Sequence, residues 1–119
     1  MYVLIVEDNQ PLADMLCNVF GIEGYRCFVI RSKATAEHFL RRVRPDLVIV
    51  DYQLIGGLGL PAARIASKKS VPVIVTSGYP NVFDQVKEAG FAYLQKPFTP
   101  PELLALASSL LSPVCEVVA

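Results

Sequence analysis

The chain has 119 residues, the usual size of one domain, and 53% of them are hydrophobic, which is enough to build a packed core. Lysine plus arginine and aspartate plus glutamate each number 11, so the formal net charge is zero and gives no electrostatic footprint for nucleic acid. No apolar run approaches the roughly 18 residues that cross a membrane. We therefore expect a globular domain that neither binds nucleic acid directly nor enters a membrane.

The chain begins with a predicted strand–helix unit. Tyr2–Val6 is apolar throughout, which is typical of a strand buried on both faces of a parallel sheet. From Leu12 onward, apolar residues recur at the spacing of one helix face, and Gly21 or Gly24 could end that helix. A second strand, Tyr25–Ile30, follows and reads as an edge strand.

The middle of the chain repeats this alternation. Ser32 is a candidate N-cap for the second helix, and the apolar run Leu47–Val50 predicts the third strand. The segment Pro61–Lys68 is the weakest helical pattern, because its apolar spacing is poor. Val71–Val75 then predicts a fourth strand.

The last part of the chain adds two helices and one strand. Val82–Ala89 predicts a short helix that ends at Gly90, and Ala92–Leu94 predicts the fifth strand. Thr99 and Glu102 have the spacing of a capping box at the start of the last helix. Five alternations of strand and helix predict a single α/β domain with a doubly wound, five-stranded parallel sheet.

Polar groups follow four of the five predicted strands. These groups are the acidic pair Glu7 and Asp8, then Asp51, Thr76 and Lys96, whereas the second strand contributes nothing obvious. In an open α/β sheet, ligands bind outside the carboxyl ends of the strands. We therefore expect three carboxylates, a hydroxyl and an ammonium group to converge at one edge of the sheet.

This set of groups suits phosphoryl transfer. Asp51 can act as a nucleophile and form an aspartyl phosphate, and Thr76 can donate a hydrogen bond to a phosphoryl oxygen. Three carboxylates in one place call for a cation, and Mg²⁺ takes oxygen ligands. Lys96 is expected to pair with the phosphoryl group, so its loss should impair the phosphorylated state more than the fold.

Together these residues resemble the receiver domain of bacterial response regulators. The segments that carry the resemblance are VLIVEDN, DLVIVDYQL, PVIVTSG and AYLQKPF. The resemblance implies a flavodoxin-like (βα)5 fold with strand order 2-1-3-4-5, a receiver domain over residues 1–112 and a short tail at 113–119. It also implies that this is a phosphoacceptor that assists its own phosphorylation and dephosphorylation, not an enzyme acting on other substrates.

The resemblance assigns roles at the expected Mg²⁺ site. Asp51 would accept the phosphoryl group from a phosphohistidine. Asp8 and Asp51 would bind Mg²⁺ directly, the backbone carbonyl of Gln53 would be a third ligand, and Glu7 would act through water.

The resemblance also implies a switch and names partners. Thr76 would respond to the phosphate, Tyr93 would be the switch aromatic, and the Lys96–Pro97 bond would be cis. A sensor histidine kinase or phosphotransfer protein would supply phosphate, an unknown output partner would read it, and the last two strand–helix units could form a homodimer. The glycine-rich run at 56–59 departs from the family pattern and suggests a looser loop.

Two other functions are alternatives for a chain with this fold. One is a phosphorylation-independent interaction module with the same fold, which the full set of acidic, hydroxyl and lysine groups argues against. The other is an aspartate-nucleophile phosphatase, which usually has a second aspartate where this chain has Gln53. Cys17 and Cys27 fall in apolar patterns and are expected to be free core thiols, which fits a cytoplasmic location.

Overall fold

The computed structural model describes residues 1–111, so the predicted tail at 113–119 lies outside the described residues. The strands are β1 Tyr2–Val6, β2 Arg26–Ile30, β3 Leu47–Asp51, β4 Gln53–Leu54, β5 Gly57–Leu58, β6 Val73–Ser77 and β7 Ala92–Gln95. The helices are α1 Gln10–Ile22, α2 Lys33–Arg42, α3 Leu60–Lys68, α4 Phe83–Glu88 and α5 Pro100–Leu111, with a 3-10 turn at Pro80–Val82. None of these helices has the length and apolar character needed to cross a membrane.

The main sheet has five parallel strands in the order β2-β1-β3-β6-β7. Because β4 and β5 form a separate two-stranded hairpin, this order is the predicted 2-1-3-4-5 of a flavodoxin-like fold. The second strand is an edge strand, as expected. All five carboxyl ends therefore point to the same edge of the sheet.

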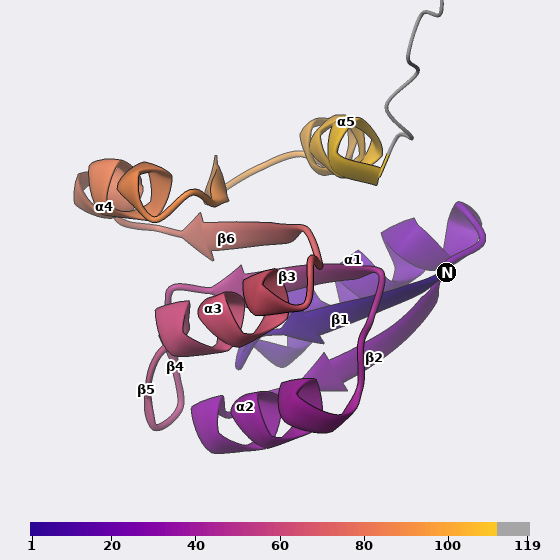
Figure 1. Cartoon of the computed structure of the whole chain (residues 1–119). Coiled ribbons are helices and arrows are strands. Elements are labelled where there is room, and N and C mark those ends of the chain that lie inside the picture. The colour runs from indigo at the N-terminus through magenta and orange to yellow at the C-terminus, as the bar shows by residue number, and fades with distance from the viewer. Residues whose placement is uncertain (112–119) are drawn as a thin grey trace, which may run out of the picture.

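The core consists of two clusters, one on each face of the sheet. Helices α2, α3 and α4, labelled in Figure 1, cover one face. Leu40, Ala63 and Val86 are among the side chains buried there. Helices α1 and α5 cover the other face, where Leu16 and Leu103 are fully buried or nearly so. Burial of both faces explains why β3 and β6 are apolar along most of their length.

Strand boundaries differ from the predicted ones for identifiable reasons. β2 begins at Arg26 because the Tyr25 N–H donates to the Phe20 carbonyl and so completes the end of α1. β6 begins at Val73 because the Val71 N–H donates to Ala66 in the preceding helix. At their other ends, β3 and β6 run further than predicted, so the residues expected just after these strands are their last members.

The predicted caps of the helices are present. Ser32 accepts from the Thr35 N–H, and Thr99 caps α5 by accepting from the Glu102 N–H. Helix α1 continues through Gly21, and Gly24 follows it with a φ of 89°. The prediction had not recognised Asn9, whose side chain caps α1 by accepting from the Leu12 N–H at 3.0 Å.

The glycine-rich segment after β3 has a defined conformation. It folds back as the β4–β5 hairpin, with φ values of 94° at Gly56 and 145° at Gly57, and the Lys33 N–H donates to the Ile55 carbonyl at 3.0 Å. A Cβ atom on Gly59 would lie 2.1 Å from the Asp51 carbonyl oxygen. The segment therefore adopts a defined hairpin, and Gly59 is required by close packing on the strand that carries Asp51, whereas a looser loop stays a prediction.

Candidate functional site

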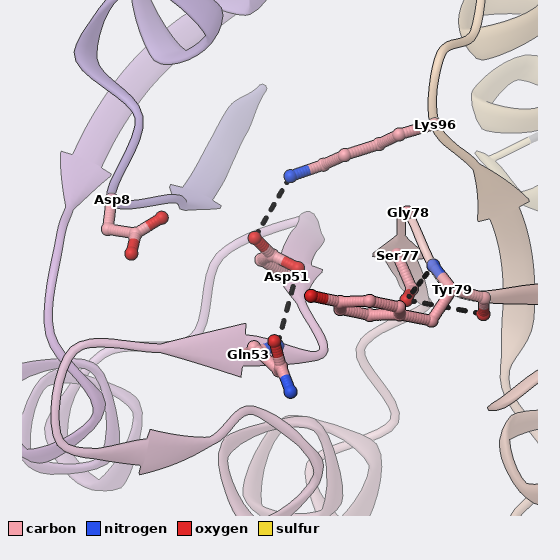
Figure 2. A pocket seen from close by; sticks show the side chains of 7 residues that line it. All are labelled: Asp8, Asp51, Gln53, Ser77, Gly78, Tyr79 and Lys96. Carbon is pink, nitrogen blue, oxygen red and sulfur yellow. Dashed lines mark hydrogen bonds and ion pairs between the residues drawn. The ribbon is translucent and has the colours of Figure 1, made fainter.

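The carboxyl ends of the central strands surround an open cleft of about 460 Å³. Figure 2 shows the seven side chains and backbone segments that line it, with Lys96 reaching toward Asp51 and with Asp8 on the far side of Asp51 from Tyr79. The lining residues are Asp8, Asp51, Gln53, Ser77, Gly78, Tyr79 and Lys96. This volume has room for an ion, its water molecules and a phosphoryl group, since one water occupies about 30 Å³ of liquid.

Lys96 joins two of the carboxylates. Its Nζ donates to Glu7 Oε1 at 2.6 Å and to Asp51 Oδ2 at 2.9 Å. The Lys96 side chain is 23% exposed, so water screens these ion pairs less than on an open surface. Lys96 is therefore already paired with carboxylates when Asp51 is unmodified, and does not wait for a phosphoryl group to find a partner.

Glu7 is the most buried member of the acidic cluster, and its side chain is 3% exposed. Burial raises the pKa of Glu7 from the ordinary 4.5 to about 7, against the opposing effect of the Lys96 hydrogen bond. The negative charge of Asp51 is a smaller contribution to the same rise in the pKa of Glu7. Burial alone would lower the pKa of Lys96, but its hydrogen bonds to Glu7 and Asp51 raise it instead.

The acidic cluster fits a divalent cation. Glu7, Asp8 and Asp51 each place a carboxylate oxygen within 4.8 Å of the other two. Three carboxylates and one ammonium leave a formal net charge of minus two, and hard oxygen donors suit Mg²⁺. Asp8 and Asp51 line the cleft, whereas Glu7 is buried and bonded to Lys96, an arrangement compatible with an indirect role for Glu7.

The segment after Asp51 also faces the cleft. Gln53 is one of the lining residues, and its backbone N–H donates to Asp51 Oδ1 at 3.3 Å. This bond folds the chain back toward the carboxylate. It brings the Gln53 backbone, the predicted third metal ligand, into the neighbourhood of Asp51.

Thr76 and Tyr93 occupy different surroundings. Thr76 pairs with Asp51 in the sheet register and is 2% exposed. Tyr93 packs against the core under α4, and its hydroxyl donates to the carbonyls of Tyr79 at 3.2 Å and Ser77 at 3.5 Å. Tyr93 thus contacts the backbone that follows Thr76.

The Lys96–Pro97 bond is cis, as expected.

Sequence reasoning gave no role to three residues at this edge of the sheet, although it placed Ser77 at the end of the fourth strand. Arg31 directly follows β2 and donates to the Asp8 carbonyl at 3.1 Å, so the second strand does contribute to the site. Ser77 Oγ accepts from the Tyr79 N–H at 2.9 Å and shapes the opposite wall of the cleft. The position of Arg31 at a strand end was a usable signal, whereas nothing in the pattern marked Tyr79.

The chain was compared with known proteins. Residues 3–108 match the family described as the response regulator receiver domain. Over 107 residues the chain is 35% identical to the DNA-binding response regulator MtrA of Mycolicibacterium paratuberculosis, covering 87% of this chain and 48% of that protein. The chain therefore spans about half the length of the curated relatives it matches.

Two solved structures add to this comparison. A putative response regulator from Chloroflexus aurantiacus is 28% identical, with a TM-score of 0.85 over 94% of this chain and 98% of that one. The receiver domain of the sensor histidine kinase PA1611 from Pseudomonas aeruginosa is 26% identical, with a TM-score of 0.78 over 92% and 96%. That receiver domain holds a magnesium ion in its active-site cleft.

Proposed function

This chain belongs to the response regulator receiver domain family, and on that premise we propose that Asp51 accepts a phosphoryl group from a phosphohistidine in a Mg²⁺-dependent reaction. The observation that carries the proposal is the placement of Asp51. Its carboxylate lines an open cleft, is held by Lys96 and lies beside two further carboxylates.

The chemistry follows from the groups at the cleft. An Asp51 oxygen attacks phosphorus, the P–N bond to the donor imidazole breaks, and the imidazole nitrogen leaves with the bonding electrons. Mg²⁺, when bound, would neutralise charge on the transferring group, with Asp8, Asp51 and the Gln53 carbonyl as ligands and Glu7 acting through water. Lys96 is within 2.9 Å of Asp51 and can transfer its hydrogen bond to the new phosphoryl oxygens.

The same proposal includes a switch. Thr76, beside Asp51 in the sheet, would donate a hydrogen bond to the phosphoryl group. A shift of the chain after Thr76 would move the two carbonyls that accept from the Tyr93 hydroxyl. Tyr93 would then favour a second position and change the surface of α4, β7 and α5, which is a shift between two arrangements.

Partners follow from the same chemistry. A sensor histidine kinase or a phosphotransfer protein would supply the phosphoryl group, and an output partner of unknown identity would read the altered surface. The relative MtrA is described as DNA-binding, whereas this chain has no excess of positive charge with which to bind DNA. A cytoplasmic location and self-association through α4, β7 and α5 stay predictions.

The decisive experiment is chemical labelling. Acetyl phosphate with Mg²⁺ should add one phosphoryl group, detected by intact mass and lost on treatment with base or hydroxylamine. Asp51→Asn keeps the shape of the side chain but removes the nucleophile, so its label should vanish. Normal labelling of Asp51→Asn on the same peptide would disprove the assignment, and no labelling of the wild type would favour a phosphorylation-independent interaction module.

A further inference from the structure

Tyr52 connects the phosphoacceptor strand to a helix outside the cleft. It directly follows Asp51, is 7% exposed and packs in the core cluster that contains Val82 and Val86. Its hydroxyl donates to Gln85 Oε1 at 2.8 Å. Gln85 belongs to α4 and is not one of the residues that line the cleft.

The backbone of Tyr52 is fixed at both of its polar groups. Its N–H donates to the Thr76 carbonyl at 2.8 Å, and its carbonyl accepts from the Gly59 N–H at 2.8 Å. The residue therefore links four parts of the domain: the phosphoacceptor, the chain at Thr76, the start of α3 and α4. A displacement of Asp51 or Thr76 therefore acts directly on the hydrogen bonds of the Tyr52 backbone.

We propose that Tyr52 is a positioning residue whose hydrogen bond to Gln85 couples the phosphoacceptor to α4 by a route separate from Tyr93. This inference rests on the proposed function, because it concerns the response to phosphate at Asp51. The bond is present while Asp51 is unmodified and paired with Lys96, so it stabilises the unphosphorylated arrangement. The Tyr52 side chain has only two rotatable bonds and a rigid ring. A shift of the Tyr52 backbone toward a moving Thr76 therefore draws the hydroxyl away from Gln85.

Phosphate at Asp51 and the Tyr52–Gln85 hydrogen bond must affect each other equally. If phosphate at Asp51 weakens the bond, then removing the bond must favour the phosphorylated arrangement by the same factor. A neutral hydrogen bond of this kind changes an equilibrium by roughly two- to tenfold. Tyr52→Phe, which removes only the hydroxyl, and Gln85→Ala, on the exposed side of α4, should therefore both bind beryllofluoride at Asp51 roughly two- to tenfold more tightly.

The test combines beryllofluoride affinities with amide chemical shifts. Before beryllofluoride is added, the α4 amides of both variants should already be displaced toward their positions in the beryllofluoride-bound wild type. The Tyr52→Phe/Gln85→Ala double variant should add nothing to the single variants. Glu88→Ala removes another exposed polar side chain from α4 and is the matched control, which should behave as wild type.

The outcomes separate two kinds of failure. If acetyl phosphate labels the wild type at Asp51 but Tyr52→Phe and Gln85→Ala bind beryllofluoride with the wild-type affinity, the coupling is wrong and the proposed function stands. If the wild type is not labelled at Asp51, the proposed function fails and the coupling falls with it. Tighter beryllofluoride binding by the Glu88→Ala control would also overturn the assignment, because it would show a general effect of α4.

Discussion

The burial of Glu7 gives a prediction about pH. The pKa of Glu7 is about 7 in the folded chain, raised by burial from an ordinary value of 4.5. Between these two values the folded chain keeps a proton that the unfolded chain has lost. The contribution of Glu7 to the free energy of unfolding must therefore fall as pH rises from about 4.5 to 7, and the whole penalty from this group is present above pH 7.

The size of the effect follows from linkage. Each pH unit across that window corresponds to about 1.4 kcal/mol, so the full penalty is roughly 3 kcal/mol. Glu7→Gln has a similar shape but cannot ionise, so it lacks this term. Between pH 5 and pH 8 the stability of the variant should therefore improve relative to wild type by roughly 2–3 kcal/mol.

Urea denaturation in EDTA at fixed ionic strength measures this difference. Glu88→Gln, on the exposed surface of α4, is the matched control and should follow the wild-type dependence on pH. Millimolar Mg²⁺ should reduce the wild-type penalty at pH 8, because the cation favours the ionised cluster. If wild type and Glu7→Gln differ by the same amount at pH 5 and pH 8, the buried position of Glu7 does not control its ionisation.

Three further results are expected. Mg²⁺ at ten times its dissociation constant should stabilise the wild type by about 1.4 kcal/mol in thermal melts, and Asp8→Asn should lose most of this shift. Gly59→Ala should lower the free energy of unfolding in urea by about 2–3 kcal/mol, because its Cβ would lie 2.1 Å from the Asp51 carbonyl oxygen. Gly21→Ala, in an open helical position, is the control and should raise that free energy by about 0.5–1 kcal/mol. Lys96→Met should lower stability by about 1–3 kcal/mol at pH 8 in EDTA, since two carboxylates lose their partner, and equal stability would contradict that pairing.

The order of elements could be predicted because each strand carries a strong local signal. Burial on both faces makes β1, β3 and β6 almost uniformly apolar, and the caps Ser32 and Thr99 mark helix starts by side-chain chemistry. The topology rule for parallel sheets then places the acidic residues and Lys96 at one edge. The family match supports this fold and domain type.

Other features depend on contacts that the sequence does not encode locally. Pairing of Lys96 with Glu7 joins residues 89 positions apart, and its distance of 2.6 Å follows from how two strands end. The β4–β5 hairpin was missed because its glycines indicate freedom of the backbone, not the particular turn they adopt. The Tyr52–Gln85 bond was missed for a similar reason, since neither residue type signals a partner.

The division of the core has a consequence for how such chains can be recombined. Helices α1 and α5, near the two ends of the described chain, supply one cluster, and α2, α3 and α4 supply the other, while strand residues contribute to both. Substitutions on opposite faces share no packing partners, so their effects on stability should add. A chimera could therefore take α1 and α5 from a relative such as MtrA and keep its own α2, α3 and α4, provided that the strand residues facing the new helices are exchanged with them.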